Sequence, residues 1–357
     1  MLTPLGVIID VAVHDSVVFL LDQQSCDIRR ITFSGETLSP IGQRGEGPGD
    51  LSQPERMAVM PDGRCLILQT VSHRATCITS GGRACDMVDI SSIKEGYKSS
   101  LFVRAEAGRS EWLLLAAVTS LRSPKDANAT FAEMGTSASV KRVRITDGKV
   151  ETLFTTETAN VPKSAVVIPL ARYTFVVHGW DVSDAGVVAY ADPAGAYRMT
   201  IGHPLDTSPR VVDLPESEGD DRRVKDLAKA LKVPDAGGIP RVSSIQWLDD
   251  EYLLVRPAAE LHPEPAVNSA GTFEVFDQAG SSYGRYDVHC EFDPDNDQAY
   301  VRGDILIVIR GAQSVARAVY RDVLTREQVE QSRRSTEVDE IRIQVYRLFR
   351  SLRATAR

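Results

Sequence analysis

Short apolar stretches recur along this chain in pairs, and a tight turn of polar residues joins the two members of each pair. The clearest pair covers residues 8–13 and 17–22, where apolar positions recur at every second residue or in short runs. This periodicity predicts strands, and the polar residues between them predict hairpins. Six such turns follow one another: His14-Asp15, Pro61-Asp62-Gly63, Ala107-Gly108, Asp184-Ala185, Asp249-Asp250 and Arg302-Gly303.

A third strand, followed by a glycine-containing turn, completes the unit in its clearest copies. Examples are residues 28–33, 75–79, 140–145 and 273–276. A unit of roughly 45 to 75 residues that is nearly all strand is typical of a propeller blade. The sequence therefore predicts an all-β fold, a single six-bladed β-propeller over residues 1–357. Residues 340–348 alternate cleanly and are predicted to be the third strand of blade six.

Three insertions interrupt the repeat. Residues 121–137 are rich in Ser, Ala, Thr and Asn and are predicted to be a long loop. Residues 221–232 begin with acidic side chains, carry apolar residues at helical spacing and precede Pro234, which predicts a short helix. In residues 315–334, Thr325 and Gln328 have the spacing of a capping box, which predicts a second helical insertion.

The composition is ordinary for a soluble globular protein. The net charge of −8 argues against a nucleic-acid partner. Arginines crowd the chain from Arg310 onward, which favours a solvated helix and strand over a surface for an acidic partner. No apolar run is long enough for a membrane span, and no secretory signal begins the chain. We expect a cytoplasmic protein, or an exported one if a leader has been removed. No oligomeric state is assigned.

Five cysteines stand at positions 26, 65, 77, 85 and 290, so at least one is unpaired. None of their spacings is that of a zinc site or a C-x-x-C motif. Cys65 and Cys77 are expected on adjacent strands of one hairpin, where a disulfide is conceivable. Buried free thiols are favoured over that pairing.

A glycine-rich segment connects the first two predicted blades. Residues 41–51 read IGQRGEGPGDL and are followed by Pro54. This segment resembles the linker of NHL-like six-bladed β-propellers, which typically reads G-x-x-G-x-G-P-G-E/D-F before a proline; here Leu51 replaces the aromatic residue. The resemblance implies a propeller fold and, for many relatives, a binding role without catalysis. Glycines in this segment let the chain cross tightly to the next inner strand, which explains them better than a phosphate site does.

A catalytic alternative rests on Glu46-Gly47-Pro48, which resembles the first metal-ligand tripeptide of gluconolactonase-like propellers. The resemblance implies a divalent ion held by oxygen ligands in the central channel, hydrolysing a lactone or ester. The companion ligands found in the sequence are Asp181, Asp184, Asn268 and Asp297. No Asn-Asp pair stands in the expected context, so no metal and no cofactor is assigned. A metal-free cyclisation of the strictosidine-synthase-like kind is the other catalytic alternative.

The histidines show no metal-binding or nucleophile-activating spacing. Segments that lead into the inner strands are expected to converge on one face of the propeller. That face is predicted to bear Arg44, Glu46, Arg56, His178 and Trp180. Arginine and aromatic side chains are over-represented where proteins bind peptides and other proteins. We therefore expect a non-catalytic module that binds a peptide or protein partner, and favour it over an enzyme.

Overall fold

The structure is a computed structural model. It describes residues 5–69, 74–85, 88–89, 101–105, 112–120, 136–144, 146–158, 180–183, 187–191, 197–202, 209–215, 222, 225–226, 241–249, 251–257, 268–293, 296–312, 315 and 341–348.

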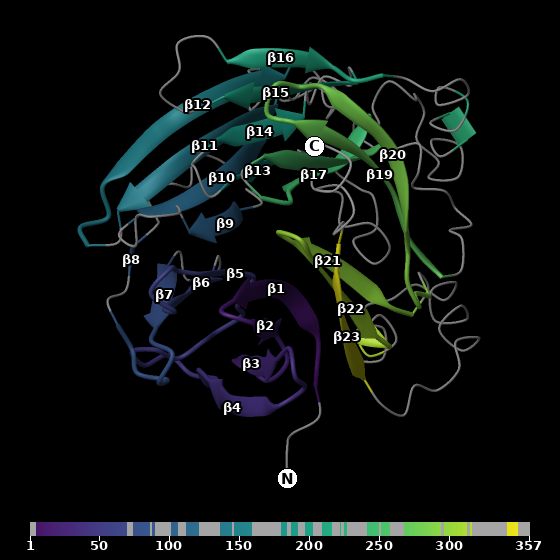
Figure 1. The fold of residues 1–357 in the computed structure, drawn as a ribbon. Helices are drawn as coiled ribbons and strands as arrows, with labels where there is room; N and C mark the ends of the chain where they lie inside the picture. Colours follow the sequence, from purple (N-terminus) through teal and green to yellow (C-terminus); the bar gives the residue numbers. More distant parts are fainter. Residues whose placement is uncertain are drawn as a thin grey trace, which may run out of the picture.

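The described residues form six small antiparallel sheets, which follow one another along the chain (Figure 1). Sheet 1 contains β1 (Ile8–His14), β2 (Val17–Asp22), β3 (Asp27–Thr32) and β4 (Thr37–Ile41). Sheet 2 contains β5 (Arg56–Val59), β6 (Cys65–Gln69), β7 (Arg74–Ile78) and β8 (Val88–Asp89). Sheet 3 contains β9 (Leu101–Ala105), β10 (Trp112–Ser120), β11 (Thr136–Arg144) and β12 (Val150–Thr158).

The second half of the chain repeats the pattern. Sheet 4 contains β13 (Trp180–Val182), β14 (Val188–Ala191), β15 (Arg198–Gly202) and β16 (Arg210–Asp213). Sheet 5 contains β17 (Val242–Trp247), β18 (Tyr252–Pro257), β19 (Ser269–Asp277) and β20 (Ser282–His289). Sheet 6 contains β21 (Gln298–Arg302), β22 (Ile305–Arg310) and β23 (Arg342–Arg347).

The first strands of the sheets face one another across the middle of the molecule. Strand β1 contacts β5 on one side and β21 on the other, β5 contacts β9, and β17 contacts both β13 and β21. Figure 1 shows the later strands of each sheet lying progressively further from this centre. Consecutive meandering sheets with their first strands innermost make a β-propeller-like fold.

The predicted strand pairs are confirmed by the hydrogen-bonded register. Each of the six predicted turns falls where the first two strands of one sheet meet, with His14 and Arg302 as the last residues of β1 and β21. Ala107-Gly108, Asp184-Ala185 and Asp250 lie outside the described residues. The four predicted third strands correspond to β3, β7, β11 and β19. Strand β23 pairs with β22, as expected for the third strand of the last unit.

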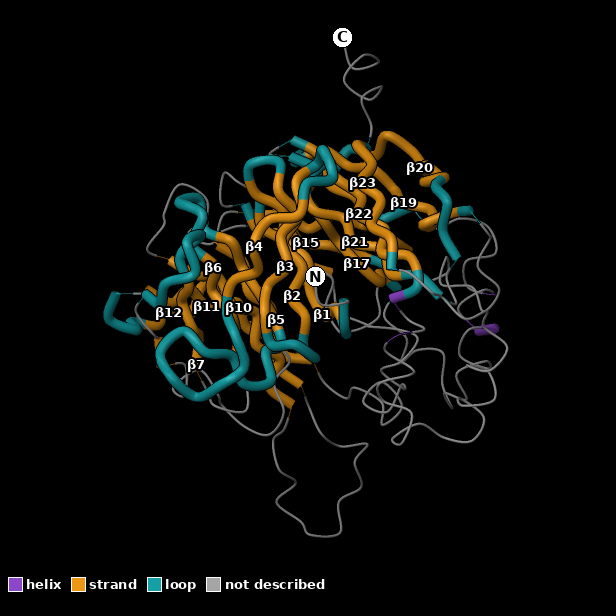
Figure 2. Tube along the Cα trace, turned by 90° about the horizontal axis from the view of Figure 1, so that it is seen from below, coloured by secondary structure: helices purple, strands orange, loops and turns teal. Residues whose placement is uncertain are grey.

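The predicted insertions lie mostly outside the described residues. Arg222, Lys225 and Asp226 have helical backbone, in agreement with the first predicted helix. Thr325 and Gln328 are not described. Residues 136 and 137 belong to β11, so the strand begins before the predicted loop ends. Within the described residues, helix is limited to a few short pieces beside the strands (Figure 2). Among the described residues, none lies in a helix with the length and apolarity that a membrane crossing requires.

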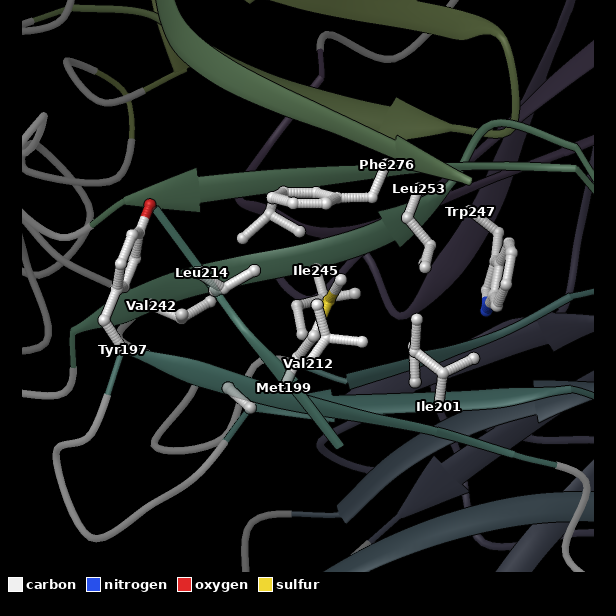
Figure 3. Close-up of a cluster of buried hydrophobic side chains, with 13 residues drawn as sticks. Tyr197, Met199, Ile201, Val212, Leu214, Val242, Ile245, Trp247, Leu253 and Phe276 are labelled. Carbon is white, nitrogen blue, oxygen red and sulfur yellow. The ribbon is translucent and has the colours of Figure 1, made fainter. Parts of the chain in front are cut away.

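Apolar side chains from neighbouring sheets form the core, and they explain why the second strands are so uniformly apolar. In β2, Phe19 and Leu21 pack in a cluster with Met57 of sheet 2, whereas Val18 and Leu20 pack with Ile307 of sheet 6. Both faces of the second strand are therefore buried, and strict alternation is lost. Between sheets 4 and 5 a similar cluster extends from Tyr197 at one end to Trp247 at the other (Figure 3).

The outer strand of sheet 1 is shielded by a side chain of its neighbour. Arg30 of β3 donates from Nε and Nη2 to the Ser39 carbonyl of β4, at 3.0 and 2.7 Å, and from Nη1 to the Ser80 carbonyl of sheet 2, at 2.9 Å. The residue after Ser39 is Pro40, which has no backbone N–H. Arg30 thus ties the edge of sheet 1 to a turn of sheet 2.

The cysteine prediction was partly wrong. Cys77 forms a disulfide with Cys85, eight residues along the chain, and not with its neighbour Cys65 on β6. The Cys85 amide also donates to the Cys77 carbonyl at 2.9 Å, because a tight turn brings the two residues side by side. Cys26, Cys65 and Cys290 are buried free thiols, as expected. Burial raises the pKa of the Cys65 thiol to about 12.

Candidate binding site on the linker face

The linker between β4 and β5, residues 42–55, folds back on itself in a way that requires glycine. Gly42 and Gly49 have φ values of +78° and +81°, which residues with a Cβ rarely adopt. A Cβ on Gly49 would also lie 2.9 Å from the Cβ of Ala84. The predicted conformational role of the linker glycines is confirmed at these two positions.

Hydrogen bonds close the linker into a compact loop. The Leu51 amide donates to the Gln43 carbonyl at 2.7 Å, and the Gly45 amide donates to the Leu51 carbonyl at 3.2 Å. Asp50 accepts from the Gly47 amide and from Gln43 Nε2, at 2.9 Å in each case. Because both carboxylate oxygens of Asp50 are engaged, this side chain fixes the turn.

The second strands of sheets 1 and 2 anchor this loop. Gln69, the last residue of β6 and fully buried, accepts from the Ser52 amide at 2.5 Å and donates to the Asp50 carbonyl at 3.3 Å. Gln23, just beyond β2, donates to the Pro54 carbonyl at 3.3 Å. We call the side of the molecule that carries this linker, where β1 and β5 begin, the linker face. The opposite side, where Asp62 and Gly63 turn, is the turn face.

The predicted ligand-binding residues are only partly brought together. Arg44 and Glu46 are exposed on the linker, and Arg44 donates from Nη2 to the Gln24 carbonyl at 2.5 Å. Arg56 begins β5 and donates to the Glu55 carbonyl at 2.8 Å. Trp180 begins β13 in sheet 4, away from these three residues in the sheet order, and His178 lies outside the described residues.

Sequence reasoning missed Arg74, which begins β7 beneath the linker. Its Nη2 lies 3.8 Å from Glu46 Oε2, and its side chain is 16% exposed. Arg74 Nε and Nη2 are both buried and make no hydrogen bond within the described part of the chain. The available signal was its position: Arg74 is paired with Gln69 at the open end of an otherwise apolar hairpin.

Carboxylates near the centre align neighbouring sheets. Asp10 of β1 accepts the Met57 amide of β5 at 2.9 Å and a hydrogen bond from Arg302 Nη2 of β21 at 3.0 Å. Asp181 of β13 accepts the Trp247 amide of β17 at 2.8 Å. Trp247 itself is 4% exposed and packs between sheets.

The carboxylates named for a metal site are used in other ways. Asp181 binds a backbone amide, as just described. Asp297 accepts from the Gly311 and Asp293 amides at 2.9 and 2.8 Å and lies 3.0 Å from Arg310 Nε. Asn268 lies in a turn before β19, with a φ of +67°, and Asp184 is not described. Within the described residues, no group of three or more His, Cys, Asp or Glu side chains is arranged to hold a metal ion.

Comparison with known proteins shows similarity at the level of the fold. No family model and no curated protein matches the sequence. A member of the DUF4221 family from Bacteroides vulgatus aligns with a TM-score of 0.51 and 11% identity, over 96% of this chain and 93% of that one. A putative exported protein from Bacteroides fragilis has a TM-score of 0.46 and 11% identity, with coverage of 97% and 91%. Virginiamycin B lyase from Staphylococcus aureus has a TM-score of 0.44 and 9% identity, over 88% of this chain and 94% of that one.

Proposed function

We propose that the chain is a single six-bladed propeller of the NHL-like kind that binds a peptide or protein partner on its linker face without catalysing a reaction. Support for six blades comes from the six consecutive sheets of the described residues and from the contacts between their first strands. Support for the NHL-like assignment comes from the linker, whose glycines adopt the conformations such a crossing needs.

The observation that carries the binding proposal is the architecture of the linker. Its backbone is fixed by internal hydrogen bonds and by Gln69 and Gln23, so its shape exists before a partner arrives. It presents Arg44 and Glu46 to solvent. A preformed surface avoids much of the ordering cost of binding. The net charge of −8 makes a peptide or protein a better partner than a nucleic acid.

Selection from a displayed library of random peptides tests this proposal. The expected result is a set of peptides whose binding is lost in a variant carrying both Arg44→Glu and Arg56→Glu. The matched control is Arg64→Glu, because Arg64 lies in the turn between β5 and β6, on the turn face beside Asp62. Peptides that bind the control and the double variant equally would place the interaction elsewhere and refute the proposal.

The Cys77–Cys85 disulfide favours the exported alternative for localisation. Disulfides of this kind form and persist in oxidising compartments and are rare in the cytosol. Trapping thiols with a polymer-linked maleimide at the moment of cell lysis measures this directly. Two protected cysteines support an oxidising compartment, and five reactive cysteines after denaturation would contradict it.

A further inference from the structure

Arg74 has an unusual environment among the arginines of the described structure. Its Nε and Nη2 atoms are shielded from water and donate no hydrogen bond within the described residues. A shielded guanidinium normally has its donors satisfied, because burying an unpaired charge is costly. Several other partly or fully buried arginines of the described chain follow this rule and lie within 3.2 Å of a carboxylate oxygen: Arg29, Arg64, Arg285, Arg302 and Arg310. Arg256 also has a shielded Nε outside any hydrogen bond of the residues described, but its guanidinium lies 5.8 Å from the centre of the Phe273 ring.

The carboxylate next to Arg74 is poorly placed to satisfy it. Glu46 Oε2 lies 3.8 Å from Arg74 Nη2, beyond hydrogen-bonding distance, and the Glu46 side chain is 80% exposed. An ion pair with so exposed a partner contributes little. Asp50, another acidic residue of the linker, already accepts from Gly47 and Gln43. The linker therefore leaves the donors of Arg74 without a strong acceptor.

We propose that Arg74 binds a carboxylate side chain of the partner, so that the ligand of the linker face is an acidic peptide. This inference rests on the proposed binding function and specifies its ligand. Nε and Nη2 are shielded in the free protein, so the incoming carboxylate reaches them only by displacing the exposed Glu46 side chain. It then accepts from both atoms together, the paired geometry that guanidinium and carboxylate groups favour. Glu46 then acts as a displaceable competitor. Arg44, two residues before Glu46 on the linker, adds a second exposed positive charge to the linker face.

The test uses the full chain and a fluorescein-labelled, C-terminally amidated tetraglutamate peptide, with binding followed by fluorescence anisotropy. We expect saturable binding of tetraglutamate and none of tetraglutamine. Arg74→Gln should weaken binding about tenfold or more, since a hydrogen bond to a charged group is lost. Glu46→Gln should strengthen it severalfold, because the competing carboxylate is gone. Arg64→Gln on the turn face is the matched control and should leave the affinity unchanged.

Arg74→Lys separates loss of the binding group from loss of folding. This variant keeps the charge but not the planar fork, so we expect a cooperative thermal transition together with weakened binding. Unchanged affinity in Arg74→Gln and Arg74→Lys, or no gain in Glu46→Gln, overturns the inference. If the inference fails but the binding of neutral library peptides still requires Arg44 and Arg56, the proposed binding function stands. If no peptide of any charge depends on the linker face, the proposed function fails as well.

Discussion

The junction between sheets 1 and 2 and the junction between sheets 4 and 5 are built on the same polar contact and filled with different side chains. At the first junction, Asp10 accepts the Met57 amide of the next inner strand; at the second, Asp181 accepts the Trp247 amide. Each bond joins strands of two different sheets, which the pairing within a sheet cannot align. A buried carboxylate–amide bond is directional, so it fixes the position of one inner strand against the next.

Behind this contact the two junctions differ. The first is packed with aliphatic and sulfur-containing side chains, including Cys26, Met57 and Cys65, together with Phe19. The second contains Trp247 and a buried polar pair, in which Tyr197 Oη donates to Glu274 Oε2 at 2.9 Å. The comparison indicates that the aspartate sets the alignment, while the apolar filling can vary as long as the volume is occupied.

The largest expected effect distinguishes the two aspartates. Asp10→Ala should lower the free energy of unfolding by about 3 kcal/mol, since it leaves Arg302 without its carboxylate and the Met57 amide without an acceptor. Asp181→Ala should lower it by about 2 kcal/mol, the range for an orphaned buried amide. Urea unfolding monitored by circular dichroism measures both. A smaller loss for Asp10→Ala than for Asp181→Ala would contradict the role given to Arg302.

The disulfide makes the first region covalently different from the second. Cys85→Ser should cost about 2 kcal/mol of stability under non-reducing conditions, because the unfolded chain gains the freedom of a short loop. Adding a reductant to the protein of native sequence should lower its free energy of unfolding by the same amount, as measured by urea unfolding. The reductant should not change the midpoint of Cys85→Ser. Equal stability of both proteins without reductant would show that the disulfide does not contribute.

The buried tyrosine tests the filling of the second junction. Tyr197→Phe removes one donor to Glu274 while Arg285 Nε remains 3.2 Å from the other oxygen, so we expect a loss of about 1.5 kcal/mol in thermal or urea unfolding. Tyr286→Phe is the matched control, because its hydroxyl donates to the Tyr283 carbonyl at an exposed position. If the two variants lost similar amounts of unfolding free energy, burial of the Tyr197 hydroxyl would not increase its contribution to stability.

The smallest effect concerns the thiol in the first junction. The Cys65 pKa is raised from 9.0 to about 12 in the folded protein, so the unfolded chain loses this proton first as the pH rises. Stability from this group is therefore complete below pH 9 and falls as the pH rises from about 9 toward 12, by about 1.4 kcal/mol at pH 10. Comparing urea midpoints of the native sequence and Cys65→Ala at pH 8 and pH 10 isolates it. Between pH 8 and pH 10, the urea midpoint of Cys65→Ala should fall less than that of the native sequence.

Local pattern was enough to predict most of the strands. Period-two apolar residues and Asp- or Gly-containing turns found the strand pairs, because a hairpin is specified by neighbours in sequence. The disulfide also had a local signal that was not used. Cys77 and Cys85 stand four residues on either side of Gly81, at the centre of the turn that follows the third strand. Strand β8 contains only Val88 and Asp89, so no periodic pattern marked it.

The candidate site was harder to predict because its contacts join distant residues. Asp10 and Met57 are 47 residues apart, and Asp181 and Trp247 are 66 apart. Nothing in the sequence near Asp181 distinguishes a carboxylate that binds an amide from one that binds a metal. Arg74 was missed for the same reason, since its importance depends on the linker that lies over it. The exposed linker residues were predictable because they belong to one contiguous motif.

The outer edge of sheet 1 has a consequence for the behaviour of the protein at high concentration. An exposed edge strand offers donors and acceptors on which a second molecule can add its own strand, the first step of ordered aggregation. In β4, the Ser39 carbonyl is already occupied by Arg30 of β3. Strand addition that used this carbonyl would have to displace a guanidinium. Sheet 1 is thereby protected against polymerisation by one arginine of the neighbouring strand.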